Sequence, residues 1–253
     1  MPVKSQLRAR WNPLFAALLF VALIALAGCA QKTQPAQTPQ NSEAAPPAAD
    51  ASAPPAAADA SSTTPQEGAL YTPKYIPNGN EVAVIKTNKG TIKVKLYGKD
   101  APINTGNFIE LAMKGFYDGV KFHRLEPGFV IQGGDPQTQK LTSAQVKKLV
   151  ADQNAGAYNQ GDPMLGTGGP GYVIKGEFDP ANIPHKHVDG TLAMARTTDP
   201  NSAGSQFYFT LAPQPPLDGK YTVMGDTTSG LQVVHSLGVG DVIESITIEN
   251  ATK

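Results

Sequence analysis

The sequence predicts a mainly β fold, a closed β-barrel whose ends are plugged by helices. Short apolar runs of strand length recur from residue 81 to the C-terminal region, and Gly, Pro, Asn and Asp separate them. Two other segments, 102–113 and 231–237, instead carry apolar residues at helical spacing. Many short strands accompanied by two helices are typical of a closed barrel.

The first two predicted strands form a hairpin. Glu81–Thr87 and Thr91–Tyr97 alternate in strand fashion, and the turn residues 88–90 lie between them. The remaining strands are predicted at 121–125, 129–132, 191–195, 206–211, 221–224 and 242–248. The helix predicted at 102–113 is followed by Gly115, which is a typical glycine stop.

Charge excludes one class of partner. The 21 basic and 21 acidic side chains balance, and without Lys4, Arg8 and Arg10 the chain has 21 − 3 = 18 basic groups against 21 acidic ones. Such a chain lacks the concentrated basic face that nucleic acid requires, so no nucleic-acid partner is expected. Cys29 is the one cysteine, which excludes an intramolecular disulfide.

The N-terminus has the order of a secretory signal peptide, predicted at 1–28. Three basic residues precede an apolar run, Leu14–Ala27, which is shorter than the roughly 20 residues of a membrane span. Residues 26–29, Leu-Ala-Gly-Cys, match the lipobox of bacterial lipoproteins, so a lipid on Cys29 is expected; the alternative is a structural cysteine at the end of a signal anchor. The expected location is the bacterial cell envelope, on the periplasmic side of the outer membrane or the outer face of the cytoplasmic membrane.

Residues 29–77 are predicted to be a disordered linker. They are mostly Ala, Pro, Gln, Ser and Thr, and such a segment buries too little apolar surface to offset its ordering entropy. About 45 residues span about 37 Å as a flexible coil and up to about 140 Å as polyproline II. One domain is then expected at 78–253.

Four sequence blocks in the second half of the chain resemble the cyclophilin family. They are Phe122–Asp135, Gly166–Gly169, Leu192–Arg196 with Gly204–Tyr208, and Leu217–Val223. They occur in the family's order, and the resemblance covers about residues 80 to 250. It implies an eight-stranded antiparallel barrel capped by two helices, and peptidyl-prolyl cis-trans isomerase activity.

The resemblance assigns the chemistry to two residues. Rotation about an X–Pro bond is slow because the amide nitrogen shares its lone pair with the carbonyl. A donor placed against that nitrogen localises the lone pair, and Arg124 resembles the family residue with this role. Gln132 is expected to hydrogen-bond the substrate backbone. This chemistry requires no metal, nucleotide or other cofactor.

The resemblance also assigns the residues that bind substrate. Phe129, Val130, Tyr208 and Leu217 are expected to line an apolar proline pocket, with Tyr221 at its rim. The main chain at Ala195 and Arg196 positions the peptide, Gln206 orients Arg124, and Thr167 borders an adjacent subsite. Tyr208 stands where Phe is usual, Tyr221 where many relatives have His, and Pro216 where many have Trp, which puts inhibitor affinity in doubt.

The connection between Asp135 and the glycine block is about 25 residues longer than in compact family members. Thr142 and Gln145 have capping-box spacing, and Val146 and Val150 belong to an apolar stripe, so a short helical insertion is predicted at 143–152, near the substrate entrance. A purely decorative surface loop is the alternative. His185 and His187 are interpreted as solvated loop histidines, and no metal site is expected.

The sequence therefore predicts a monomeric isomerase acting on X–Pro bonds of unfolded or newly translocated envelope or secreted polypeptides. The alternative is a non-catalytic chaperone or holdase that binds proline peptides in the same groove. Arg124 favours the enzyme, because a binding module does not need that donor.

Overall fold

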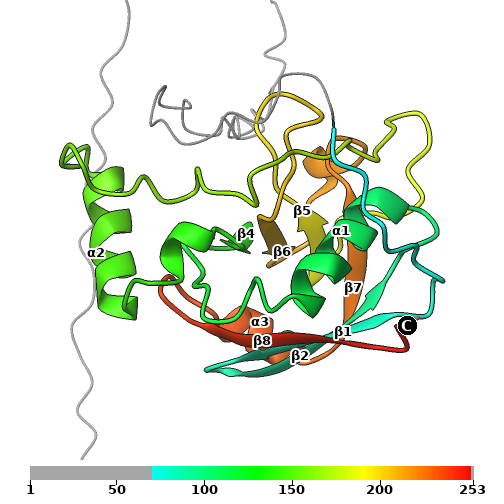
Figure 1. Ribbon diagram of the computed structural model, residues 1–253, viewed down its shortest axis with the longest axis horizontal. Helices are drawn as coiled ribbons and strands as arrows, with labels where there is room; N and C mark the ends of the chain where they lie inside the picture. The colour runs from blue at the N-terminus through cyan, green and yellow to red at the C-terminus, as the bar shows by residue number, and fades with distance from the viewer. Residues whose placement is uncertain (1–69, 252–253) are drawn as a thin grey trace, which may run out of the picture. The chain divides into compact units, whose positions relative to one another are not determined.

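The computed structural model describes residues 70–251, which form one antiparallel sheet accompanied by three α-helices (Figure 1). The predicted signal peptide, Cys29 and most of the predicted linker lie outside the described residues. The strands are β1 (Val82–Thr87), β2 (Gly90–Leu96), β3 (Arg124–Glu126), β4 (Val130–Gly133), β5 (Thr191–Met194), β6 (Phe207–Thr210), β7 (Val223–Ser229) and β8 (Ile243–Glu249). The helices are α1 (Pro102–Met113), α2 (Ser143–Asn154) and α3 (Leu231–Ser236).

The eight strands pair in the order β3-β4-β6-β5-β7-β2-β1-β8. The predicted hairpin is confirmed, since β1 and β2 pair antiparallel from Val82 opposite Lys95 to Thr87 opposite Gly90. The main hydrophobic core lies on the inner face of the sheet, where Phe207 packs edge-on against Phe108 of α1 and against Phe209.

The expectation of a closed barrel is wrong for this structure. The edge strands β3 and β8 share no ladder with each other. The segments that precede them meet at one isolated bridge between Lys121 and Val242 and through backbone hydrogen bonds between residues 119–122 and 240–243. Gly119 and Gly240, which flank this contact, have φ angles of +79° and +86°. A left-handed conformation interrupts an extended strand, so the contact does not continue as a ladder. The sheet is therefore a curled, open antiparallel sheet.

The three helices occur where the sequence predicts them. Helix α1 packs against β8 and α3 against β2. Helix α1 lacks a side-chain cap at Ala101, and the Glu177 carboxylate, distant in sequence, accepts the backbone N–H groups of Ile103 and Asn104 at 2.9 and 2.8 Å. A carboxylate is favourable there because it complements the positive end of the helix dipole.

Helix α2 belongs to the predicted insertion. The Thr142 and Gln145 capping box is formed in both directions, and Val146 is the buried residue of the helix. Figure 1 shows α2 on the side of the fold away from α1. None of the helices described between residues 70 and 251 combines the length and apolar character needed to cross a membrane.

Residues 70–77, which the sequence assigns to the linker, are attached to the domain. Glu110 of α1 accepts hydrogen bonds from the Tyr71 hydroxyl at 2.6 Å, the Tyr75 backbone N–H at 2.8 Å and the Lys74 backbone N–H. The Tyr71 ring contacts Tyr172 with centroids 4.2 Å apart. Tyr71 and Tyr75 are the residues from which this attachment could have been predicted, because aromatic side chains can bury apolar surface where the Ala and Pro residues before them cannot.

Candidate functional site

One cleft of about 1010 Å³ gathers the residues that the resemblance singled out. They come from strands and loops that are far apart in the sequence. The predicted site residues that line it are Arg124, Phe129, Val130, Gln132, Thr167, Ala195, Arg196, Gln206, Tyr208, Leu217 and Tyr221. The structure thus brings these residues together in one cleft. The role of each residue in binding or catalysis is still a prediction.

The apolar part of the cleft is a small cluster separate from the main core. Val130, Ala193, Tyr208 and Leu217 are buried together, and Phe129, Ala195 and Tyr221 pack against them. Strand alternation explains the separation, because successive side chains point to opposite faces. Ile131 and Phe209 therefore face the main core, whereas Val130 and Tyr208, their chain neighbours, face the cleft.

A chain of three hydrogen-bonded polar side chains, one guanidinium and two amides, lies beside this pocket. Arg124 Nη1 donates to Gln132 Oε1 at 3.5 Å, and Gln132 Nε2 donates to Gln206 Oε1 at 2.8 Å. Gln206 Nε2 in turn donates to the carbonyls of Gly166 and Gly168 at 2.9 and 2.8 Å. Gln206 thus reaches Arg124 through Gln132 rather than directly, which refines the predicted orienting role.

The side chain of Arg124 is partly exposed at the cleft. Its Nε lies 3.7 Å from Glu126 Oε1, and 42% of the Arg124 side chain is exposed. An exposed pair of this kind contributes little to stability. The surface ion pair with Glu126 therefore exists, but it leaves donors of the guanidinium free to act on a ligand in the cleft.

Asp135 holds the glycine loop, a role that sequence reasoning missed. Its carboxylate is fully buried and accepts the backbone N–H groups of Gly166 at 2.6 Å, Gly168 at 3.3 Å and Gln137 at 2.8 Å. A Cβ atom on residue 168 would lie 2.1 Å from Asp135 Oδ1, so only glycine fits there. The adjacent Thr167 hydroxyl accepts from Gln137 Nε2 at 3.1 Å.

Arg196 supports the rim of the pocket. Its Nε and Nη2 atoms donate to the Lys220 carbonyl at 3.0 and 2.7 Å. The guanidinium carbon lies 4.6 Å from the Tyr221 ring centroid and 5.0 Å from that of Phe178. These two cation–π contacts fix the side chain, and the position of Tyr221 with it.

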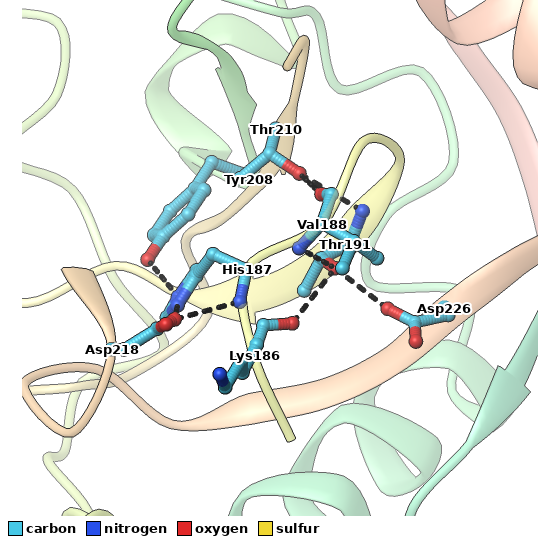
Figure 2. A network of polar contacts seen from close by, with 8 residues as sticks. All are labelled: Lys186, His187, Val188, Thr191, Tyr208, Thr210, Asp218 and Asp226. Atoms are coloured by element: carbon cyan, nitrogen blue, oxygen red, sulfur yellow. Dashed lines mark hydrogen bonds and ion pairs between the residues drawn. The ribbon is translucent and has the colours of Figure 1, made fainter. Parts of the chain in front are cut away.

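The interpretation of His187 as a solvated loop histidine is wrong. Only 2% of the residue is exposed, and its ring joins Asp218 and Tyr208 (Figure 2). His185 lies elsewhere, stacked on Tyr97 at 3.6 Å and 3.0 Å from Asp100. The two histidines contact different carboxylates, so their closeness in sequence does not make a joint metal site.

The insertion forms part of the cleft wall. Val150, Gln153 and Asn154 of α2 line the cleft together with Tyr158 and Met164, which follow the helix. Gln153 Nε2 also donates to the Leu165 carbonyl at 3.4 Å, next to the glycine loop. The helix predicted near the substrate entrance therefore borders the same cleft as Arg124.

Comparison with known proteins identifies close relatives. A family model described as "Cyclophilin type peptidyl-prolyl cis-trans isomerase/CLD" matches residues 82–253. A peptidyl-prolyl cis-trans isomerase of Helicobacter pylori is 40% identical over 171 residues, covering 67% of this chain and 87% of that protein. Peptidyl-prolyl cis-trans isomerase B of Bacillus subtilis is 39% identical over 158 residues, covering 62% and 90%. A crystal structure of a cyclophilin-type isomerase of Cryptosporidium parvum with the dipeptide Ala-Pro has a TM-score of 0.52 and 26% identity, covering 67% and 99%.

Proposed function

Because this chain belongs to the cyclophilin-type peptidyl-prolyl cis-trans isomerases and isomerises X–Pro bonds, we propose that the cleft around Arg124 is its active site. We also propose that its substrates are unfolded or newly translocated polypeptides of a bacterial envelope. The observation that carries the first proposal is the position of the partly exposed Arg124 side chain beside a separate apolar pocket in one cleft.

The geometry suits catalysis by selective stabilisation of the twisted amide. The barrier to rotation is about 18–20 kcal/mol because resonance gives the C–N bond double-bond character. The pocket of Val130, Tyr208 and Leu217 would hold the proline ring, and Arg124 would donate a hydrogen bond to the proline nitrogen as its lone pair localises. That interaction is strongest in the twisted state, so it lowers the barrier.

The polar chain beside the pocket would keep Arg124 and Gln132 in place. Gln206 holds Gln132, and the glycine loop holds Gln206 through two carbonyls. The holdase alternative uses the same groove but requires neither the guanidinium nor its orientation. The family relationship and this orientation together favour the enzyme.

The substrate class follows from the cleft and from a relative. The Cryptosporidium parvum structure was obtained with an Ala-Pro dipeptide, which supports a proline-containing ligand in this cleft. The cleft continues from the proline pocket to α2 and Tyr158, well beyond the size of one dipeptide. This extension supports polypeptides as substrates, with residues flanking the X–Pro bond against the insertion.

The location is proposed from the sequence alone. The signal-peptide order and the Leu-Ala-Gly-Cys block at 26–29 support a lipid on Cys29 and an envelope location. Multiple acyl chains anchor a protein stably where one chain does not. The linker would let a monomeric domain reach chains that emerge near the membrane.

The active-site assignment is tested with Arg124→Ala in full-length protein solubilised in detergent. A protease-coupled assay of an X–Pro peptide, without added metal or nucleotide, should show at least about a tenfold loss of kcat/KM, or about 1.4 kcal/mol. Glu126→Gln is the matched control, because it breaks the same ion pair but keeps the guanidinium. Full activity of Arg124→Ala, or an equal loss in Glu126→Gln, would contradict the assignment.

A further inference from the structure

We propose that His187 is a positioning residue of the proline pocket, which holds the Tyr208 ring in the pocket wall and joins it to the Leu217 turn through Asp218. This inference rests on the active site proposed above. His187 is not among the described residues that line the cleft, so its effect on substrate is indirect. Of the two side chains that it contacts by hydrogen bonds, Tyr208 lines the cleft and Asp218 does not, so Tyr208 is the route that we propose.

The three side chains form a continuous hydrogen-bonded chain (Figure 2). His187 Nε2 lies 3.1 Å from the Tyr208 hydroxyl, and His187 Nδ1 lies 3.0 Å from Asp218 Oδ1. The imidazole and the Tyr208 ring are nearly parallel, with an angle of 13° between their planes. The side chain of His187 is 0% exposed, and Tyr208 is buried as well.

The chemistry of the partners fixes the direction of each hydrogen bond. A carboxylate can only accept, so His187 Nδ1 carries the proton that is donated to Asp218. Burial lowers the pKa of His187 and raises that of Tyr208 well above its ordinary value. The imidazole is therefore neutral, its Nε2 is an acceptor, and the Tyr208 hydroxyl donates to it.

The backbone around His187 makes the imidazole a fixed point. Asp218 Oδ1 also accepts the His187 backbone N–H at 2.8 Å. The His187 carbonyl accepts from the Gln214 N–H at 2.8 Å, and this contact ties the His187 loop to the turn that carries Leu217. The imidazole is thus held through its own backbone on both sides.

The residues that follow His187 attach the same loop to the sheet. The Thr191 hydroxyl accepts from the Val188 N–H at 3.0 Å and donates to Asp226 Oδ1 of β7 at 2.6 Å. Figure 2 shows these contacts next to the His187 ring. The loop therefore has little freedom to move the imidazole away from Tyr208.

These contacts connect three parts of the pocket that are distant in sequence. Tyr208 belongs to β6, His187 precedes β5, and Asp218 directly follows Leu217. Tyr208 also meets the rim residue Tyr221 edge-on, with centroids 5.9 Å apart. A shift of the Tyr208 ring would therefore change both the wall and the rim of the proline pocket.

A double-mutant cycle in full-length protein tests this role. His187→Phe keeps a flat, buried ring but removes both hydrogen bonds, and Tyr208→Phe removes only the hydroxyl. In the wild-type background, His187→Phe should raise KM for an X–Pro peptide about three- to tenfold while kcat changes less than about twofold. This is the effect expected from losing the neutral hydrogen bond that holds the Tyr208 hydroxyl. In the Tyr208→Phe background the same change should alter KM by less than about twofold.

His187→Gln supplies the conservative variant, because its amide can accept from Tyr208 and donate to Asp218. It should restore KM to within about twofold of wild type. If His187→Phe does not fold, Tyr208→Phe alone decides the question, because it breaks the same hydrogen bond and should raise KM about three- to tenfold. Equal effects of His187→Phe in both backgrounds, or an unchanged KM in His187→Phe or in Tyr208→Phe, would overturn the proposal. Arg124→Ala measured in the same assay separates this result from a failure of the active-site assignment, since only the latter leaves that variant fully active.

Discussion

The clearest consequence of the site geometry concerns the buried carboxylate of Asp135. Asp135→Asn preserves shape but replaces one acceptor oxygen with an N–H₂ group. Oδ1 accepts from Gln137, whereas Oδ2 accepts from Gly166 and Gly168. An amide can satisfy only one of these two sides, so at least one buried N–H loses its acceptor.

The expected cost follows from the number of bonds lost. A buried donor without a partner costs about 1–3 kcal/mol, and the remaining bonds lose the assistance of the negative charge. We expect the free energy of unfolding to fall by about 2–4 kcal/mol, which corresponds to a Tm lower by roughly 5–15 °C for a domain of this size. The loosened glycine loop should release Gln206, so kcat/KM should fall about three- to tenfold.

Thermal unfolding followed by circular dichroism measures the first effect, and the protease-coupled assay, run well below the lower Tm, measures the second. Asp179→Asn is the matched control, because Asp179 also accepts the N–H group two residues further on, but in an exposed loop. Its Tm should stay within about 2 °C of wild type. A native Tm and native kcat/KM in Asp135→Asn would refute the reasoning, and a lower Tm with native kcat/KM would limit Asp135 to a stabilising role.

Four further predictions concern other parts of the chain. Cys29→Ser should abolish incorporation of a fatty-acid analogue in metabolic labelling, and label that persists would contradict lipidation at Cys29. Cyclosporin should bind with a Kd above about 1 μM by titration calorimetry, because Pro216 supplies neither the aromatic wall nor the indole donor of relatives with Trp there; nanomolar binding would contradict this. Replacing residues 138–164 with a short Gly/Ser connection should lower kcat/KM on an unfolded protein substrate more than on a tetrapeptide, and equal effects would leave the insertion without a role in binding. Burial lowers the pKa of His123 from 6.5 to about 4, so between these pH values the unfolded chain binds a proton that the native state does not. The free energy of unfolding should therefore fall by about 3 kcal/mol as the pH drops from about 6.5 to 4. Urea unfolding at several pH values measures this, and His123→Gln should remove that part of the pH dependence.

Local sequence signals predicted the elements well. The capping box at Thr142 and Gln145 located the start of α2, and alternation with turn residues located the first hairpin. These signals succeed because both structures depend on contacts within a few residues. The gathering of the site residues into one cleft also agrees with the family blocks.

Long-range contacts account for what the sequence did not reveal. Whether the sheet closes depends on how residues near 119 and 240 meet. His187 is buried, and the partners of its ring, Tyr208 and Asp218, lie 21 and 31 residues further along the chain. Asp135 is similar, since its partners Gly166 and Gly168 follow about 30 residues later. A pattern within a single segment contains no information about such partners.

The division of β4 and β6 between two faces has a consequence for how this fold can diverge. Of two neighbouring residues, one packs in the main core and the other faces the cleft, as Ile131 and Val130 do in β4 and Phe209 and Tyr208 do in β6. Substitutions at the cleft-facing positions can accordingly alter ligand preference while the main core on the other face keeps its packing. Their cost in stability falls on the small cluster around Val130 and Tyr208 rather than on the core that holds the sheet together.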